Sequence, residues 1–209
     1  ICIVEKNSDV YSSSFEVPST RQFLNDTAAA YRKNLPCPFI GITGTNGKTT
    51  TKDLLAHVLS ASMDVMSTKG NFNSTIGVPL SVFECGKDAD IAIIEMGANK
   101  PGEIEYICEI VQPDMGIITN VYEAHIEYFG TIDAVAETKS ALFSSLPKSG
   151  TAFVNMDDKY IPGMSVPCNR VEYSFFRSAD FNGKWSEDKQ GIIINGSLVE
   201  LSSSSYVLG

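Results

Sequence analysis

The sequence predicts an α/β fold: a mostly parallel sheet with helices on both faces. Two observations predict it. Continuous apolar segments typical of buried strands recur along the chain, and segments with apolar residues at helical spacing stand between them. A third observation concerns the region from about residue 171 onward, where short strand-like segments are joined by turns containing Gly and Asn. This region is expected to form an antiparallel extension at the edge of the sheet.

Composition and charge narrow the class of protein. The chain has 209 residues, 43% of them hydrophobic, which is enough for a sizeable core. Its net charge of −9 argues against nucleic acids and anionic membranes as partners, because both repel an acidic surface. The sequence shows neither a signal-peptide pattern nor a run of roughly 18 apolar residues, so we expect neither export nor a membrane span. The five cysteines lack zinc or redox spacing, which indicates free thiols in a reducing cytosol.

The first half of the chain contains two strand–helix units. Residues 37–43 form an apolar run bounded by prolines, as expected of a strand buried on both faces. A helix is predicted over 48–60, with apolar residues at helical spacing: Leu54, Leu55, Val58 and Leu59. Residues 89–97 have the pattern of a second buried strand. Residues 101–111 follow as a second helix, with Pro101 at its first position.

The second half continues the alternation. A strand is predicted over 114–121, a helix over 131–147 with Thr131 as its cap, and a further strand over 150–158. Residues 1–35 hold one strand and a helix, and the chain opens with Ile1 inside an apolar run rather than with Met. We therefore expect this segment to be the tail of a preceding domain in a longer protein.

A loop rich in small and polar residues, Gly44-Thr45-Asn46-Gly47-Lys48-Thr49, joins the first buried strand to its helix. Its glycines allow backbone N–H groups to approach phosphate oxygens, and the helix N-terminus adds partial positive charge. Lys48 can reach the β- and γ-phosphates, and the Thr49 hydroxyl can ligate Mg²⁺. The common phosphate loop, G-x-x-x-x-G-K-[ST], would need glycine where this chain has Ile42. A plain capped turn is the alternative, but Gly-Lys-Thr-Thr between a strand and a helix favours phosphate binding.

Two other predicted strands end in polar residues. Glu95 ends the second buried strand, and Asn120 ends the third, with His125 five residues further on. The carboxyl ends of parallel strands meet at one edge of a sheet, so these side chains are expected near the phosphate loop. A buried Glu95 carboxylate would be compensated by Mg²⁺, and a solvated strand end is the alternative. His125 is a candidate ligand, whereas His57 lies off the apolar face of its helix and is expected at the surface.

A lysine and a loop complete the candidates. Lys139 falls in line with the apolar residues Val135, Leu142 and Leu146 of its helix. It is either a side chain that extends to solvent or a partly buried amine with a lowered pKa that can react with CO₂. The loop over 69–79 contains two asparagines and two glycines, and it fits either a second ligand loop or a plain turn.

Four segments, in this order and spacing, resemble the Mur ligase family: GTNGKTTT, GNFNSTIGVPL, IEMGANKPGEI and ITNVYEAHIEYFG. Within the family, the segment Glu-Met-Gly-Ala-Asn-Lys-Pro-Gly-Glu-Ile indicates the member that uses D-alanyl-D-alanine. The family's phosphate loop is G-T-N-G-K-[ST], so Ile42 is expected. The resemblance implies a P-loop NTPase-like central domain over 36–209, a remnant of an N-terminal UDP-substrate domain and linker over 1–35, and a C-terminal ligase domain that this chain lacks.

The resemblance also implies roles for the site residues. Lys48 would hold the γ-phosphate, and the metal ligands would be Thr49, Glu95, His125 and a carbamylated Lys139, around two Mg²⁺ ions. The nucleotide would contact the loop Gly44, Thr45, Asn46, Gly47, Lys48, Thr49 and Thr50, and also Asn71, Asn73 and Asn120. The family usually shows Gly-Glu after the lysine, but here Ser140-Ala141 follow.

The implied activity is an ATP-dependent amide ligase of peptidoglycan precursor synthesis in the bacterial cytoplasm. It would add D-alanyl-D-alanine to UDP-N-acetylmuramoyl-tripeptide through an acyl phosphate, and it would act as a monomer. Three alternatives stay open at this point. They are another Mur ligase or a folylpolyglutamate synthase-like ligase, a different P-loop enzyme such as a kinase or nucleotide hydrolase, and a nucleotide-binding module that is inactive on its own.

Overall fold

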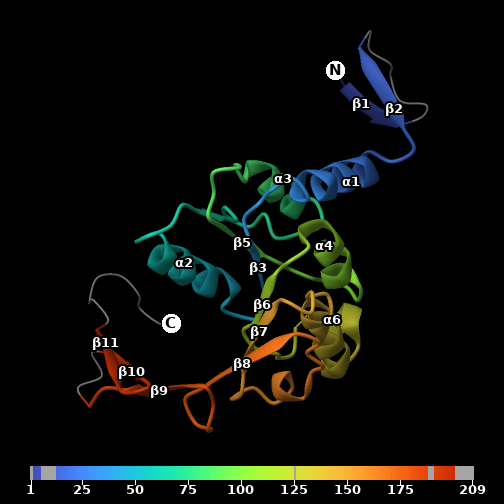
Figure 1. Ribbon diagram of the computed structural model, residues 1–209. Coiled ribbons are helices and arrows are strands. Elements are labelled where there is room, and N and C mark those ends of the chain that lie inside the picture. Colours follow the sequence, from blue (N-terminus) through green and yellow to red (C-terminus); the bar gives the residue numbers. More distant parts are fainter. Residues whose placement is uncertain (1, 6–12, 125, 188–190, 201–209) are drawn as a thin grey trace.

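A computed structural model describes residues 2–5, 13–124, 126–187 and 191–200. The body is a nine-stranded sheet with helices on both faces, and a two-stranded parallel sheet, β1–β2, lies at the N-terminal end (Figure 1). In chain order the elements are β1 (Cys2–Glu5), β2 (Ser14–Val17), α1 (Thr20–Arg32), β3 (Phe39–Thr43), α2 (Lys48–Leu59), β4 (Val65–Ser67), α3 (Gly77–Glu84), β5 (Ile91–Glu95), α4 (Glu103–Val111), β6 (Met115–Ile118), α5 (Ile126–Phe129), α6 (Ile132–Ser144), β7 (Thr151–Asn155), the 3₁₀ turn η1 (Ile161–Gly163), β8 (Asn169–Ser174), β9 (Phe181–Trp185), β10 (Gly191–Ile194) and β11 (Ser197–Glu200).

The order of strands confirms the predicted fold class. Across the sheet it is β11-β10-β9-β8-β7-β6-β3-β5-β4, and every neighbouring pair from β4 to β9 is parallel. The pairs β9–β10 and β10–β11 are antiparallel. The antiparallel extension therefore begins at β10, later than the residue 171 expected from the sequence. Residues 156–168, which include η1, form a crossover long enough to return the chain parallel to β7.

The other differences from prediction are local. Strands β4 and β9 and the short helix α5 were not predicted, because segments of three to five residues carry little periodic signal. Residues 1–35 contain two strands, not one. Pro101 lies outside α4: Gly102 adopts a left-handed conformation (φ 82°), so the helix begins at Glu103.

Helices cover the two faces of the sheet unequally. On one face, Leu55, Ala56 and Leu59 of α2 pack on alternate residues of β3 and β5, Ile40, Ile42, Ile91 and Ile93. On the other, α1, α3, α4 and α6 pack over the larger core, as Figure 1 shows. Leu54 and Val58, which the sequence placed on the apolar face of α2, are 43% and 65% exposed. No helix in the described part of the chain is long and apolar enough to cross a membrane.

A buried arginine anchors α1 to the sheet. Arg32 is 8% exposed, and its guanidinium donates to the carbonyl oxygens of Val111, Leu35 and Gln112 and to Asp114 Oδ2 at 2.8 Å. The same carboxylate oxygen accepts the Phe39 N–H at the start of β3. The guanidinium carbon also lies 3.9 Å from the centre of the Phe39 ring. One charged group thus links α1, the end of α4 and the first residue of the central strand.

Replacing Arg32 tests this anchor. Arg32→Met removes the charge and leaves three carbonyl oxygens and Asp114 without their donor, so we expect a loss of about 3 kcal/mol in the free energy of unfolding. Urea denaturation followed by circular dichroism measures it. Arg32→Lys is the matched control: it keeps the charge but lacks the planar five-donor group, and it should recover less than half of the loss. If Arg32→Met had the same free energy of unfolding as the native chain, the role of Arg32 as an anchor of α1 would be contradicted.

Candidate nucleotide-binding site

The phosphate loop leaves β3 in a conformation that only glycine allows. Gly44 has φ 149°, and a Cβ at this position would lie 1.9 Å from Thr119 Oγ1. Gly47 has φ 77° and caps α2, so the helix begins at Lys48. The first N–H groups of a helix have no partner within the helix, and they point out of its N-terminus toward the loop. The geometry is that of an anion-binding helix start.

The end of β6 holds the loop from one side. Asn120 accepts the Thr45 N–H on its carbonyl oxygen and the Asn46 N–H on its side-chain oxygen, both at 3.0 Å. The side-chain amide of Asn120 and the Thr119 hydroxyl both donate to the Asn46 carbonyl oxygen. The Thr45 hydroxyl accepts the Tyr122 N–H at 3.0 Å. The predicted residues Thr45, Asn46 and Asn120 are therefore brought together, and Asn120 acts here by fixing the loop.

Lys48 folds back over the loop that precedes it. Its ammonium donates to the carbonyl oxygens of Gly44 and Thr45, at 2.9 and 3.0 Å. Burial lowers the pKa of Lys48, and the nearby carboxylate of Glu95 opposes this shift. The next two residues of the helix, Thr49 and Thr50, are exposed. Lys48 thus places a half-buried positive charge between the loop and the end of β5.

Glu95 is a buried carboxylate, and only one of its two oxygens has a hydrogen-bond partner among the described residues. It is 2% exposed, and its Oε1 accepts the side-chain amide of Asn73 at 2.8 Å. Its Oε2 is buried and has no hydrogen-bond partner among the described residues. Asn73 comes from the loop over 69–79, and its carbonyl oxygen accepts the Gly97 N–H, so this loop closes over the end of β5. A cation would compensate the free oxygen of Glu95.

Lys139 is buried on α6. It is 5% exposed, so it does not extend to solvent. Burial, with the positive charge of Lys48 as a second cause, lowers the pKa of Lys139 to about 8. The charge of Glu95 acts on Lys48, and that of Lys48 acts on Lys139, so the end of β5 and the middle of α6 both lie near the start of α2.

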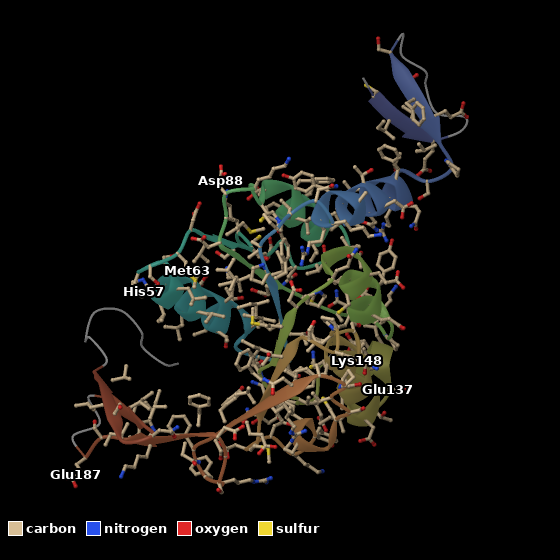
Figure 2. The ribbon with its side chains drawn as sticks, viewed as in Figure 1. His57, Met63, Asp88, Glu137, Lys148 and Glu187 are labelled. Atoms are coloured by element: carbon tan, nitrogen blue, oxygen red, sulfur yellow. The ribbon has the colours of Figure 1, made fainter. Side chains whose placement is uncertain are left out.

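Asn71 and His57 stand apart from this cluster. His125 lies outside the described residues. Asn71 is exposed, and its carbonyl oxygen accepts the Asn73 N–H. His57 is exposed in the last turn of α2, at the end far from the phosphate loop, as expected (Figure 2). Among the described residues, no group of three or more His, Cys, Asp or Glu side chains could hold a metal ion without other donors.

The sequence analysis missed a support behind Glu95. Lys52 of α2 is 4% exposed and donates to the Thr68 carbonyl oxygen at 2.7 Å. Thr68 is also buried, and its hydroxyl accepts the Glu95 N–H at 3.0 Å. Thr119 could have been found from the sequence, because it directly precedes the candidate Asn120 at a predicted strand end. Lys52 could not have been found, because a lysine in an amphipathic helix is usually exposed.

Comparison with known proteins places this site in a family. The model of the Mur ligase middle domain matches residues 42–202. The UDP-N-acetylmuramoyl-tripeptide–D-alanyl-D-alanine ligase of Escherichia coli (strain K12) is 35% identical over 178 residues, which are 85% of this chain and 39% of that protein. The enzyme of the same name from Bacillus subtilis (strain 168) is 40% identical over 157 residues, 75% of this chain and 34% of that protein. The chain therefore spans between a third and two fifths of the length of these relatives.

Solved structures agree with the sequence relatives. MurF from Acinetobacter baumannii superposes with a TM-score of 0.82 and 30% identity, over 92% of this chain and 43% of that one. MurF ligase from Thermotoga maritima in complex with ADP superposes with a TM-score of 0.81 and 30% identity, over 94% of this chain and 47% of that one. Because the middle-domain model covers most of its length, this chain belongs to the Mur ligase family.

Proposed function

We propose that this chain is the nucleotide-binding part of an ATP-dependent amide ligase. The whole protein would add D-alanyl-D-alanine to UDP-N-acetylmuramoyl-tripeptide in peptidoglycan precursor synthesis, as the names of its relatives indicate. The observation that carries the proposal is the buried Glu95 carboxylate, one oxygen of which is unpaired, beside a phosphate loop and Lys48. We assign residues 36–209 to the ATP-binding domain and 1–35 to a substrate domain and its linker, with a C-terminal ligase domain encoded elsewhere in the whole protein.

The reaction suited to this site is carboxylate activation. A carboxylate oxygen of the tripeptide attacks the γ-phosphorus of ATP, the bond to the bridging oxygen breaks, and ADP leaves. The amine of D-alanyl-D-alanine then attacks the acyl carbon of the acyl phosphate, phosphate leaves, and the nitrogen loses a proton. The first step brings two anions together. Lys48 and the N–H groups at the start of α2 stabilise the charge that collects on the transferred phosphoryl group.

The described residues fit a magnesium ion. The unpaired Oε2 of Glu95 and the exposed hydroxyl of Thr49 would hold it, together with phosphate oxygens, and we assign His125 to a second ion. Bound magnesium would supply positive charge that offsets the repulsion between the two reacting anions. The neutral amine of Lys139 would react with CO₂ to give a carbamate and a proton, which adds a further anionic oxygen ligand.

Substrate dependence tests the proposed function. We expect the whole protein to release ADP from ATP in repeated turnovers only when both UDP-N-acetylmuramoyl-tripeptide and D-alanyl-D-alanine are present, because the amine must discharge the acyl phosphate before the next turnover. A coupled assay for ADP measures this, with each substrate omitted in turn and D-alanine replacing the dipeptide as the control. ADP release at the full rate without any amine would instead favour a nucleotide hydrolase or a kinase.

Glu95→Gln tests the metal site. The amide keeps the size of the side chain but lacks the anionic oxygen. The factor by which Mg²⁺ increases the affinity for ADP should therefore fall by about tenfold or more. Calorimetry with ADP over a series of Mg²⁺ concentrations measures it. Glu109→Gln, on the exposed face of α4, changes the net charge equally and should leave this dependence unchanged. Equal effects of the two substitutions would exclude Glu95 as a ligand.

The lowered pKa of Lys139 predicts a pH-dependent stability. The folded chain releases the proton of this amine near pH 8, whereas the unfolded chain holds it up to pH 10.5. The cost of burying the charged amine is therefore fully present below pH 8. The free energy of unfolding should rise, relative to that of Lys139→Met, by up to about 3 kcal/mol as the pH increases from 8 to 10.5.

Urea unfolding in CO₂-free buffer at a series of pH values measures this difference. Lys148→Met is the control, because Lys148 is exposed beyond the end of α6 (Figure 2). In the presence of ¹³C-labelled bicarbonate, a carbamate signal in the ¹³C NMR spectrum should appear in the native chain and not in Lys139→Met. If the difference in unfolding free energy between the native chain and Lys139→Met did not change with pH, the burial of a titrating amine would be contradicted.

A further inference from the structure

Two side chains at the end of β7 hold the end of β6. The side-chain amide of Asn155 donates to the Thr119 carbonyl oxygen at 2.9 Å. Asp158, three residues on, accepts the Val121 N–H on Oδ2 at 2.9 Å. Its other oxygen, Oδ1, accepts the N–H groups of Tyr160 and Ile161. Neither Asn155 nor Asp158 was a candidate in the sequence analysis.

The segment 119–122 therefore has contacts on two sides. On one side the segment is hydrogen-bonded to the end of β7: the Thr119 carbonyl oxygen accepts from Asn155, and the Val121 N–H donates to Asp158. The other side makes the hydrogen bonds to the phosphate loop already described, through Thr119, Asn120 and Tyr122. Thr119 belongs to both sets, and the next three residues alternate between them. A displacement of the segment away from β7 would move the groups that fix Thr45 and Asn46.

We propose that Asn155 and Asp158 are positioning residues that hold the phosphate loop in its binding conformation through segment 119–122. The proposal rests on the proposed nucleotide site and adds two residues to it that do not touch the nucleotide. Asp158 is 8% exposed, and a buried carboxylate that accepts three backbone N–H groups holds them in a narrow range of positions. Strand pairing does not supply this support, because the β6–β7 register ends at Ile117 and Phe153.

The neighbouring Asp157 provides a matched control. Its carboxylate also accepts three hydrogen bonds, from the Ser174 hydroxyl and the N–H groups of Phe175 and Phe176. These partners all lie at the end of β8, and none lies in segment 119–122. Asp157→Asn and Asp158→Asn therefore make the same chemical change at adjacent positions. Only the second acts on the phosphate loop.

Hydrogen–deuterium exchange of the nucleotide-free chain tests the proposal without relying on binding. The amides of Thr45 and Asn46 donate to Asn120, so they report on the loop directly. In Asp158→Asn we expect these amides to exchange about tenfold faster, from the loss of one charge-assisted hydrogen bond. In Asp157→Asn their exchange should match that of the native chain. Should Asp158→Asn fail to fold, Asn155→Ala makes the same test through Thr119.

Calorimetry with Mg²⁺ and ADP provides the second measurement. Asp158→Asn and Asn155→Ala should weaken ADP binding by about tenfold, and Asp157→Asn should not. Unchanged exchange at Thr45 and Asn46 in Asp158→Asn would overturn the inference, as would equal acceleration in both aspartate variants. If the native chain binds no ADP, the proposed nucleotide site fails. The exchange measurement then still decides whether β7 holds the loop.

Discussion

The close contact between the ends of β3 and β6 is the constraint on which this site depends. The chain leaves β3 at Gly44, directly against the Thr119 hydroxyl, with no room for a side chain. The same contact lets the end of β6 bind the loop through Asn120. The loop is thus held by backbone and amide groups of a neighbouring strand, and the N–H groups at the start of α2 stay available to an anion.

Electrostatics adds a second level of organisation. The charge of Lys48 contributes to the lowered pKa of Lys139, and the buried carboxylate of Glu95 acts on Lys48 in the opposite sense. Burying two positive charges near each other is unfavourable. The arrangement is kept here because the packing of the sheet and α6 fixes the positions of Lys48 and Lys139 despite that cost. A site with this charge pattern is prepared for a polyanion and cations rather than for a neutral ligand.

Much of the fold could be predicted because its signals are periodic. The fully buried strands β3 and β5 appear as unbroken apolar runs, and the helix α6 shows both its stripe and its cap at Thr131. The placement of Glu95 and Asn120 near the phosphate loop followed from the rule that parallel strands end at one edge, and Lys48 followed from the loop motif itself. The supporting residues did not follow, because Lys52, Asn155 and Asp158 act through backbone groups of distant segments. Their local sequence carries no trace of those partners, and the parallel pairing of β8 was equally hidden.

The pairing of β3 also bears on the order in which the protein is made. Phe39 pairs with Ala92 and Ile40 with Met115, so the central strand finds its neighbours only after long stretches of later sequence have left the ribosome. Such non-local contacts require closure of large loops before they contribute stability. A nascent chain that ends before β6 already contains all residues of the phosphate loop. It lacks the strand whose end fixes the conformation of that loop. The proposed nucleotide affinity would therefore arise late in synthesis, when β6 and β7 have joined the sheet.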